Sequence, residues 1–490
     1  MKKIITSLTL LITILALSSA AFAADAAPAS KDAAITDGKW TELARRYPIP
    51  AVSGDVVDAP SAEVLASWWN ILNDETLTKL IMMSLNNNRD LVSARAKVQE
   101  ARASLGINKA AVLPWLDASG YWDRGQTPVN TGGSGSIANV YHLGVDASWE
   151  IDIFGGRATT IKSGVATLQA QNAALHSTWV SLSAETAINY LSLRTLQESL
   201  AIARENLALQ KDSLEMVQSR YKTGLTDILA LNQATYIYEQ TRASIPPIET
   251  GIENMKNNLA ILTGVVPGSL EEMLAEKKPI PKAKAVNLVG IPANALRRRP
   301  DIFAAERQLA AQIARTKSAR ADLWPKFYLA GSIGTETLGA EDALFTGPQK
   351  VFSFGPRISW PIFHWGAIKN NIRVQGARQE QYLAAYEKTV LSAVGEVRDA
   401  ITAEIKEHSR NEALKNGVES AKVAWAAANE KYKNGLTDYN TVIAAQQALL
   451  QLSEAYAKSE GEMTSNLVRL FKALGGGWEP LSETAPAPGK

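Results

Sequence analysis

The chain has 490 residues, of which 46% are hydrophobic and 20% are charged, and its formal net charge is +2. These values are typical of a protein with a large core, and the charges of both signs are interspersed, so nothing indicates a nucleic-acid partner. Cysteine is absent, which excludes disulfides, thiolate metal sites and a cysteine nucleophile.

The N-terminus has the pattern of a secretory signal peptide. Lys2 and Lys3 precede an apolar run from Ile4 to Leu17, and Ala21-Phe22-Ala23 offers a small-x-small cleavage site. We expect cleavage after Ala23; an uncleaved anchor is the alternative, although the run is short for a membrane span. No later stretch has 18 consecutive apolar residues, so a mature protein in a membrane would have to cross it with strands.

The next part of the chain predicts helices followed by two strands. Residues 24–62 form a lead segment rich in Ala, Pro, Asp and Ser, and helical periodicity follows from Ser67. The helical periodicity is interrupted at Asn86-Asn87-Asn88 and continues from Asp90 to about Val112. An alternation of apolar and polar residues then predicts two strands, 116–123 and 140–153. A flexible Gly/Ser-rich loop, 131–136, lies between them.

A long helix with a coiled-coil seam follows. Residues 155–222 contain no proline, and an uninterrupted helix of that length would span roughly 100 Å. Its seam positions recur at 4-3 spacing: Leu196, Leu200, Ala203, Leu207, Gln210, Leu214, Val217 and Tyr221. After a turn at Gly224, a second helix is expected from Thr226 to about Leu262, interrupted at Pro246-Pro247.

The whole unit occurs twice, at one offset of 211 residues. Tyr221-Lys222-Thr223-Gly224-Leu225-Thr226-Asp227 returns as Tyr432-Lys433-Asn434-Gly435-Leu436-Thr437-Asp438, and 366–433 is again free of proline. The second seam keeps Leu414, Val418, Ala421, Trp425, Ala428 and Tyr432, while Glu407 and Asn411 replace Leu196 and Leu200. We divide the chain into a signal peptide (1–23), an N-terminal segment (24–85), repeat 1 (86–264), a proline-rich connector (265–296), repeat 2 (297–475) and a tail (476–490).

This architecture requires neighbouring subunits. Each repeat supplies two strands, and four strands cannot close a membrane barrel, since the smallest use eight. An open sheet in lipid would leave its edge N–H and C=O groups unsatisfied. Two chains would give eight strands and three would give twelve. The residues alone predict a mainly α protein with membrane β-strands, in which an oligomeric strand barrel continues into a helical one.

Two motifs resemble those of TolC-type outer-membrane efflux factors, in the branch that serves resistance-nodulation-division pumps. The first runs from Ser67-Trp68-Trp69 through Asn88-Arg89-Asp90-Leu91. The second runs from Leu296-Arg297-Arg298-Arg299-Pro300-Asp301-Ile302 through Ala304-Ala305-Glu306-Arg307-Gln308-Leu309 to Pro325. The resemblance implies a homotrimer with a twelve-stranded outer-membrane barrel, continued by a periplasmic helical tunnel with an equatorial belt. Relatives often carry a lipid-attachment cysteine; without one, this chain is expected to be unlipidated.

The resemblance also implies partners and a function. The Gly turns would lie at the periplasmic tip and bind a membrane-fusion adaptor, which links the tunnel to an inner-membrane pump. The protein would be a passive duct for drugs or other small toxic solutes, with a gate at the tip. The alternatives are the exit duct of a type I protein-secretion system and a periplasmic coiled-coil protein without a pore.

The candidate sites follow from these patterns. Gly224 and Gly435 permit the left-handed conformation that a helix reversal needs. The resemblance implies that the adaptor docks on both glycines and on ten further residues of the two motifs: Tyr221, Lys222, Leu225, Thr226, Asp227, Tyr432, Lys433, Leu436, Thr437 and Asp438. Asp227 and Asp438 are also candidate gate residues, because Ala444 stands where relatives often have aspartate.

Aromatic residues near the strands could form an interfacial girdle or be ordinary aromatics of a soluble sheet: Tyr121, Tyr141, Trp149, Trp360 and Trp365. Arg297-Arg298-Arg299, beside Pro300-Asp301, is interpreted as a solvated helix start rather than an anion site. The four histidines are dispersed and no catalytic motif is present, so we expect no enzyme activity, cofactor or metal.

Overall fold

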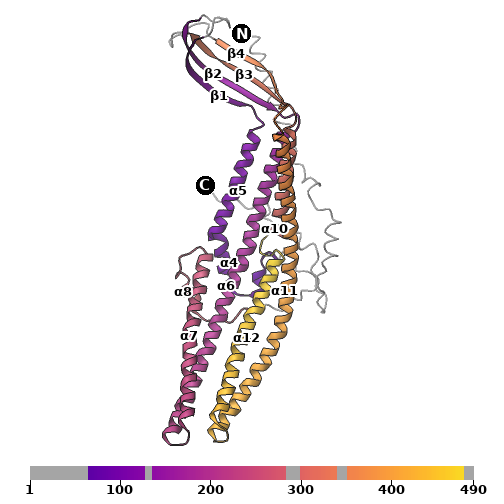
Figure 1. Ribbon diagram of the computed structural model, residues 1–490. Helices are drawn as coiled ribbons and strands as arrows, with labels where there is room; N and C mark the ends of the chain where they lie inside the picture. Colours follow the sequence, from indigo (N-terminus) through magenta and orange to yellow (C-terminus); the bar gives the residue numbers. More distant parts are fainter. Residues whose placement is uncertain (1–64, 127–134, 283–297, 339–349, 479–490) are drawn as a thin grey trace. The chain divides into compact units, whose positions relative to one another are not determined.

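The computed structural model describes residues 65–126, 135–282, 298–338 and 350–478 (Figure 1). All of them belong to one compact unit, Tyr47–Lys490. The predictions for the signal peptide, for most of the lead segment, for residues 131–134 of the loop, for residues 283–296 of the connector and for most of the tail lie outside the described residues.

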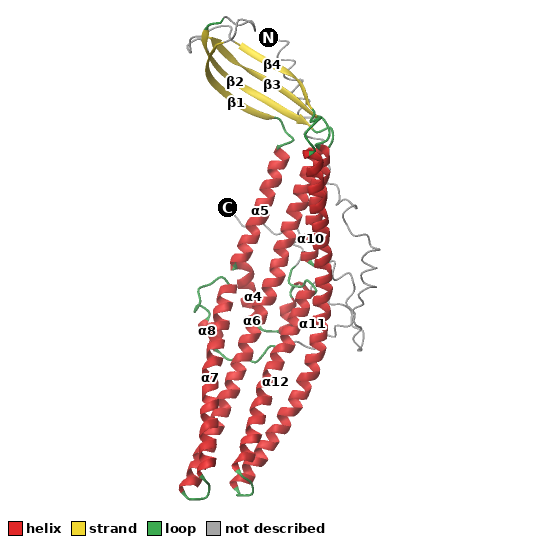
Figure 2. Cartoon of the chain, viewed as in Figure 1, coloured by secondary structure: helices red, strands yellow, loops and turns green. Residues whose placement is uncertain are grey.

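Helices and one sheet make up the unit, with the helices packed side by side (Figure 2). In chain order the elements are η1 (Trp68–Leu72), α4 (Glu75–Asn87), α5 (Arg89–Ala110), β1 (Trp115–Gln126), β2 (Ile137–Ile151), α6 (Gly156–Lys222), α7 (Ile228–Leu262), α8 (Glu271–Ala275), α10 (Pro300–Ala321), β3 (Lys326–Leu338), β4 (Lys350–Ser359), α11 (Ala367–Lys433) and α12 (Tyr439–Ala473).

The elements of the two repeats correspond one to one. The corresponding helices have equal lengths: α5 and α10 have 22 residues, α6 and α11 have 67, and α7 and α12 have 35. Gly155 (φ 71°) and Gly366 (φ 81°) precede the two long helices. Both proline-free stretches are therefore single helices, as the absence of proline indicated.

The predicted interruption at Pro246-Pro247 is wrong, because α7 runs through both prolines. An interior proline removes a backbone hydrogen bond and costs about 3 kcal/mol or more. The carbonyl of Pro246 accepts a hydrogen bond from Thr250 Oγ1 at 3.0 Å, so the following turn stays formed. Leu196 of α6 packs against Gly251 of α7, and such packing rather than local propensity stabilises the helix.

The seam of α6 is more polar than predicted. Ala203, Gln210 and Val217 are buried as expected, whereas Tyr221 is 41% exposed and the leucines of the predicted seam are half-buried. The buried row consists largely of short polar or small residues: Ser199, Ala203, Asn206, Gln210, Ser213 and Val217. Because α6 packs against both α7 and α12, its buried face lies between two neighbours, and the leucines flank it.

Two equivalent residues join the ends of each repeat. Asn88 Nδ2 donates to the carbonyl of Leu262 at 3.0 Å, and Arg299 Nη1, 211 residues later, donates to the carbonyl of Ala473 at 2.7 Å. Arg299 is 6% exposed and also pairs with Asp301 at 2.7 Å. The prediction that Arg299 belongs to a solvated helix start is therefore wrong: its guanidinium satisfies the carbonyl end of α12.

The strands form one antiparallel sheet in the order β1-β2-β3-β4. The two hairpins have the same register, since Trp115 pairs with Ser148 and, shifted by 211, Lys326 pairs with Ser359. β2 joins the two repeats by pairing with β3, with Ser148 opposite Ala330. β1 and β4 are the edges of the described sheet.

Candidate functional site

The sheet has one apolar and one polar face. Residues directly opposite each other on paired strands point to the same face, so the register assigns every side chain. Most exposed large apolar residues of the strands lie on one face, and Trp115 and Val351 are the exceptions: the former are Leu116, Trp122, Ile137, Leu143, Val145, Ile151, Ile333, Phe352, Phe354 and Ile358. An apolar face open to the outside is the arrangement that a membrane strand presents to lipid.

Hydrogen-bonding side chains occupy the opposite face. Tyr121 stacks on His142, with ring centroids 4.8 Å apart, and its hydroxyl donates to Glu336 Oε2 at 3.2 Å. Ser119 Oγ donates to Asp146 Oδ2 at 2.6 Å in the same way. This network is suited to contact with water.

The register divides the predicted girdle residues of the strands between the two faces. Tyr121 lies on the polar face, opposite to the face of Tyr141 and Trp149, so the predicted girdle residues do not share one face. Tyr141 and Trp149 lie on the apolar face, and Trp149 Nε1 donates to the carbonyl of Val112 at 2.9 Å. Trp360 is 55% exposed and Trp365 is 88% exposed. For all five residues the girdle remains a prediction.

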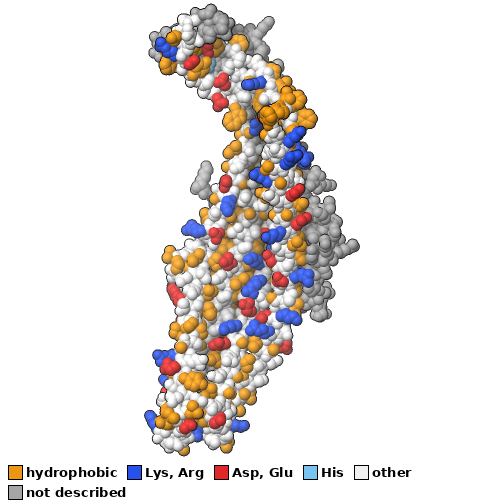
Figure 3. Space-filling model, viewed as in Figure 1, with side chains coloured by type: hydrophobic (Ala, Val, Ile, Leu, Met, Phe, Trp, Pro, Cys, Tyr) orange, Lys and Arg blue, Asp and Glu red, His pale blue; other side chains and the backbone are white. Residues whose placement is uncertain are grey.

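Apolar side chains that were not predicted for the girdle are also exposed near the sheet. Trp122, Phe352 and Phe354 stand on the apolar face, and Ile362 and Phe363 follow β4. Figure 3 shows hydrophobic side chains gathered where strands meet helices, with Lys and Arg side chains nearby on the helices. The alternation of residues along the strands could have identified Trp122, Phe352 and Phe354 as strand residues. Assigning them to one face of the sheet requires the strand pairing.

The two Tyr-Lys-x-Gly-Leu-Thr-Asp motifs form the helix reversals, as predicted. Gly224 has φ 71° and Gly435 has φ 72°. The Leu225 N–H donates to the carbonyl of Arg220 at 2.8 Å, and the Leu436 N–H makes the equivalent bond to Lys431 at 2.9 Å. These are Schellman endings, which close the last turn of a helix at a left-handed residue.

Each motif ends in the N-cap of the returning helix. Asp227 Oδ1 accepts the N–H of Ala230 at 2.9 Å, and Asp438 Oδ1 accepts the N–H and the hydroxyl of Thr441 at 3.0 and 2.8 Å. The backbone and hydroxyl hydrogen bonds from Thr441 lower the pKa of Asp438. Both carboxylates have a structural task, and their gating role remains a prediction.

The outer surface of the reversals carries exposed leucines together with exposed lysines and aspartates. Leu225 and Leu436 are 69% and 75% exposed, although a Schellman motif often packs this residue back onto its helix. Lys222 and Lys433 are exposed beside them. Tyr432 is 5% exposed, unlike its equivalent Tyr221.

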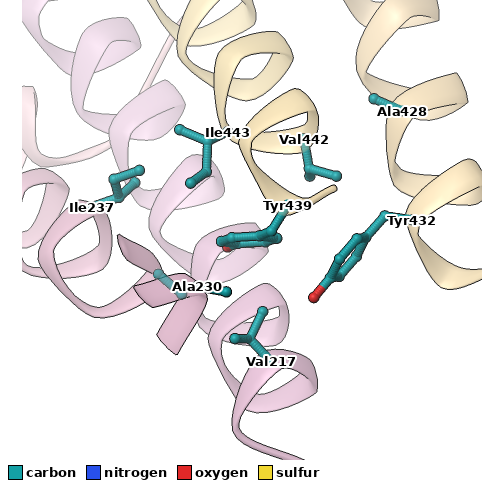
Figure 4. Close-up of a cluster of buried hydrophobic side chains, with 9 residues drawn as sticks. Val217, Ala230, Ile237, Ala428, Tyr432, Tyr439, Val442 and Ile443 are labelled. Atoms are coloured by element: carbon teal, nitrogen blue, oxygen red, sulfur yellow. The ribbon is translucent and has the colours of Figure 1, made fainter. Parts of the chain in front are cut away.

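An apolar cluster joins the two helix pairs just above the turns (Figure 4). Tyr432 and Tyr439 lie 5.2 Å apart and pack with Val217 and Ala230. Burial raises the pKa of Tyr439 to about 12. Arg220 adds a polar contact that the sequence analysis missed: its Nη1 donates to the carbonyl of Tyr432 at 2.8 Å, and its guanidinium lies 4.8 Å from the centroid of that ring.

A pair of carboxylates interrupts the apolar packing of α11. Glu404 and Glu407 occupy the positions equivalent to Leu193 and Leu196 of repeat 1. Glu407 Oε1 accepts a hydrogen bond from Ser459 Oγ at 2.5 Å, whereas Glu404 Oε2 is buried without a hydrogen-bond partner. Burial, with the charge of Glu407, raises the pKa of Glu404 to about 7.

Within the described ranges, none of the helices combines the length and apolarity needed to cross a bilayer. Residues 80–265 and 291–476 match the family model of outer membrane efflux proteins. The chain belongs to the outer membrane efflux protein family. The two matches begin 211 residues apart, so the model recognises each repeat separately.

Relatives span almost the same length. The chain is 30% identical over 419 residues to the toluene efflux pump outer membrane protein TtgF of Pseudomonas putida, and the match covers 85% of this chain and 86% of that protein. It is 29% identical over 424 residues to the outer membrane protein OprJ of Pseudomonas aeruginosa, covering 84% and 86%.

Solved outer-membrane channels share the fold. OprN superimposes with a TM-score of 0.81 at 31% identity, covering 89% of this chain and 99% of OprN. The open state of MtrE from Neisseria gonorrhoeae gives 0.77 at 26% identity, covering 88% and 96%. The predicted family and the predicted efflux function in the outer membrane are confirmed.

Proposed function

We propose that this efflux protein is the passive outer-membrane duct of a tripartite system. Three copies close their four-stranded sheets into a twelve-stranded barrel, and their helices continue it as a tunnel through the periplasm. This proposal is based on the sheet, which has an exposed apolar face and a polar opposite face. Within the described chain, each of its two edge strands pairs with a strand on one side only. In lipid, the unpaired N–H and C=O groups of such edges find hydrogen-bond partners only when further strands close the sheet into a barrel.

The tip of the tunnel is the proposed docking surface for a membrane-fusion adaptor, which connects the duct to an inner-membrane pump of the resistance-nodulation-division type. Leu225 and Leu436 are exposed there next to Lys222 and Lys433. A protruding turn with an exposed leucine beside charged side chains favours a partner with an apolar groove and a polar rim.

The duct exports drugs or other small toxic solutes and performs no chemistry on them. Relatives named for toluene efflux or pyoverdine export support a small-molecule cargo. At rest the packed helices close the tip, and adaptor binding favours a splayed arrangement. The mature chain is held by its barrel, after signal-peptide cleavage at Ala23 and without a lipid anchor.

Membrane extraction followed by native mass measurement tests this assignment. The protein should stay in outer membranes washed with salt and carbonate, and detergent should release it as an assembly of three copies. Release by carbonate as a monomer would overturn it in favour of a coiled-coil protein without a pore. Loss of a secreted polypeptide in a deletion strain, with unchanged drug accumulation, would instead assign a protein-secretion duct.

A further inference from the structure

The ends of the helices next to the sheet carry basic residues and no acidic ones. Four stretches of the chain lead into or out of the strands: 101–113, 156–184, 307–321 and 361–379. None of these stretches contains an aspartate or a glutamate, whereas charges of both signs are interspersed along the rest of the same helices. Each stretch contains at least two lysines or arginines, so positive charge is concentrated beside the sheet.

The basic residues of α10 lie on two different sides of the helix. Lys317 and Arg320 are about 60° apart round the helix axis, whereas Arg315 is about 160° from Lys317. Arg315 Nε donates to Ser163 Oγ at 3.2 Å, so it points along α6. Lys317 lies about two helical turns before Trp324 and therefore shares its side of the helix.

Trp324 identifies that side as the one that continues the apolar face of the sheet. Its ring stacks on Phe154 with centroids 5.3 Å apart, and Phe154 in turn contacts the ring of Phe327 at 6.5 Å. Phe327 pairs with Ile151 on the apolar face. Lys317 and Arg320, both exposed, therefore lie below the apolar face.

Helix α6 shows the same division. Arg157 Nη2 contacts Glu150 Oε2 at 2.7 Å, and Glu150 belongs to the polar face of β2. Lys162 is exposed and lies about 140° from Arg157 round the helix, on the other side.

The repeat places a basic residue at the same two positions in its other copy. Arg373 of α11 is the equivalent of Lys162, and Lys109 of α5 is the equivalent of Arg320. Both are exposed. Their equivalents stay exposed although α6 and α10 pack against each other, so helix packing of this kind leaves the position open. We name the set on the apolar side the basic collar: Lys109, Lys162, Lys317, Arg320 and Arg373.

The basic collar differs from the polar side in its charge balance. On the polar side Arg157 is paired with Glu150, and Lys326 is paired with Asp322 at 3.0 Å. Among the described residues, no collar residue forms an ion pair with a carboxylate, and Arg373 contacts only the neutral amide of Asn370, at 3.4 Å. Unpaired positive charges at one depth and on one side favour an anionic surface.

Exposed apolar side chains lie between the basic collar and the strands (Figure 3). Trp324, Phe363 and Trp365 are 53%, 70% and 88% exposed. The order of apolar strands, aromatic residues and cations matches the order of hydrocarbon, interface and phosphate groups in a bilayer. The headgroup layer is roughly 5–8 Å thick, and the collar residues lie within about 9 Å of the helix ends, on side chains long enough to reach it.

We propose that the basic collar binds the anionic headgroups of phospholipids in the leaflet that faces the helices. The lysines supply point charges and the arginines supply paired N–H donors to the phosphate oxygens, while the acyl chains lie against the aromatic residues and the apolar face. This proposal rests on the proposed function, because it requires the sheet to lie in a bilayer. It adds a preference for lipid charge to the apolar contact.

Lipid titration of the purified three-copy protein in detergent tests the basic collar, with native mass spectrometry to count bound lipids. The probes are phosphatidylglycerol and phosphatidylcholine with identical acyl chains, so that only the headgroup differs. Lys317→Gln removes one collar charge, and Lys317→Gln combined with Arg373→Gln removes two. Arg315→Gln is the matched control, because it removes a charge at a similar depth of the same helix but on another side.

The natural chain should bind phosphatidylglycerol more tightly than phosphatidylcholine. Each collar charge near an anionic headgroup should contribute about a fivefold factor, so Lys317→Gln should weaken phosphatidylglycerol binding about fivefold and the double variant about 25-fold. Arg315→Gln should bind phosphatidylglycerol like the natural chain, and all variants should bind phosphatidylcholine equally. Higher ionic strength should reduce the preference for phosphatidylglycerol.

Equal affinity of three-copy natural protein for the two lipids would overturn the basic collar and leave the proposed function standing. Equal losses for Lys317→Gln and Arg315→Gln would do the same. Displacement of phosphatidylglycerol by an equal concentration of inorganic phosphate would show an adventitious ion site only, and would also overturn the proposal. Release of the natural chain from membranes by carbonate, as monomers, would overturn both the basic collar and the proposed function.

Discussion

The contact between Arg220 and Tyr432 should hold the two helix pairs together at the tip. Arg220 donates a charged hydrogen bond of 2.8 Å to the carbonyl of Tyr432 and lies over its ring. A charge-assisted hydrogen bond contributes about 1.5–2 kcal/mol here, and the cation–π contact adds about 0.5–1 kcal/mol. If opening separates the pairs, Arg220→Ala should raise the open-to-closed ratio on the order of 30- to 150-fold.

Single-channel recording in planar lipid bilayers measures that ratio. Arg220→Lys keeps the positive charge but loses the planar guanidinium group. Its open-to-closed ratio should therefore lie between those of the natural protein and Arg220→Ala. Tyr432→Phe should resemble the natural protein, because the Tyr432 hydroxyl has no hydrogen-bond partner among the described residues. Arg242→Ala removes an exposed arginine whose ion pair with Glu239 stays within α7, and it should have no effect.

Equal open probabilities for Arg220→Ala and Arg242→Ala in normally assembled channels would refute the role of Arg220 in holding the helix pairs together. An effect of Tyr432→Phe as large as that of Arg220→Ala would also contradict it, because the hydroxyl would then be the group that matters.

Three further changes test other parts of the structure. Gly435→Val places a β-branched residue at φ 72°, at a cost of about 1–2 kcal/mol, and should weaken drug export at normal protein levels; unchanged susceptibility would count against the turn's importance. Gly461→Ala puts a Cβ 2.1 Å from Thr195 Oγ1 and should lower the thermal midpoint by overpacking, with recovery when Thr195→Ala is added; failure of that recovery would exclude this contact as the cause. The pKa of Glu404 is raised from 4.5 to about 7, so the folded state keeps a proton that the unfolded chain releases, and stability should fall as pH rises through that window. Glu404→Gln should flatten the dependence of stability on pH, whereas Glu412→Gln, at an exposed position, should leave it unchanged. Equal stability–pH profiles for the two variants would contradict the role of Glu404.

The repeat and the element types were predictable because strong local signals agree. Proline-free stretches, paired glycines and the constant offset of 211 predicted α6 and α11 to within about one residue. Gly224 and Gly435 need φ near 70°, which few other residues adopt, so the reversals could be placed from sequence.

Prediction from sequence stops where tertiary contacts decide the outcome. Tyr121 has the composition of a girdle residue, but only the pairing with His142 shows that it faces the polar side. Pro246 breaks helices locally, yet α7 continues beside α6. Arg299 is charged and was expected in solvent, but the C-terminal carbonyl of α12 gives it a buried partner. In each case the deciding group lies far away in sequence.

Conductance of the detergent-extracted, assembled protein in a planar bilayer tests the central claim, a transmembrane duct closed at its tip. The natural chain should give discrete unitary steps that are small or rare, and Arg220→Ala should open for longer or more often. Three-copy assemblies of both proteins that insert into the bilayer without any unitary step would contradict it.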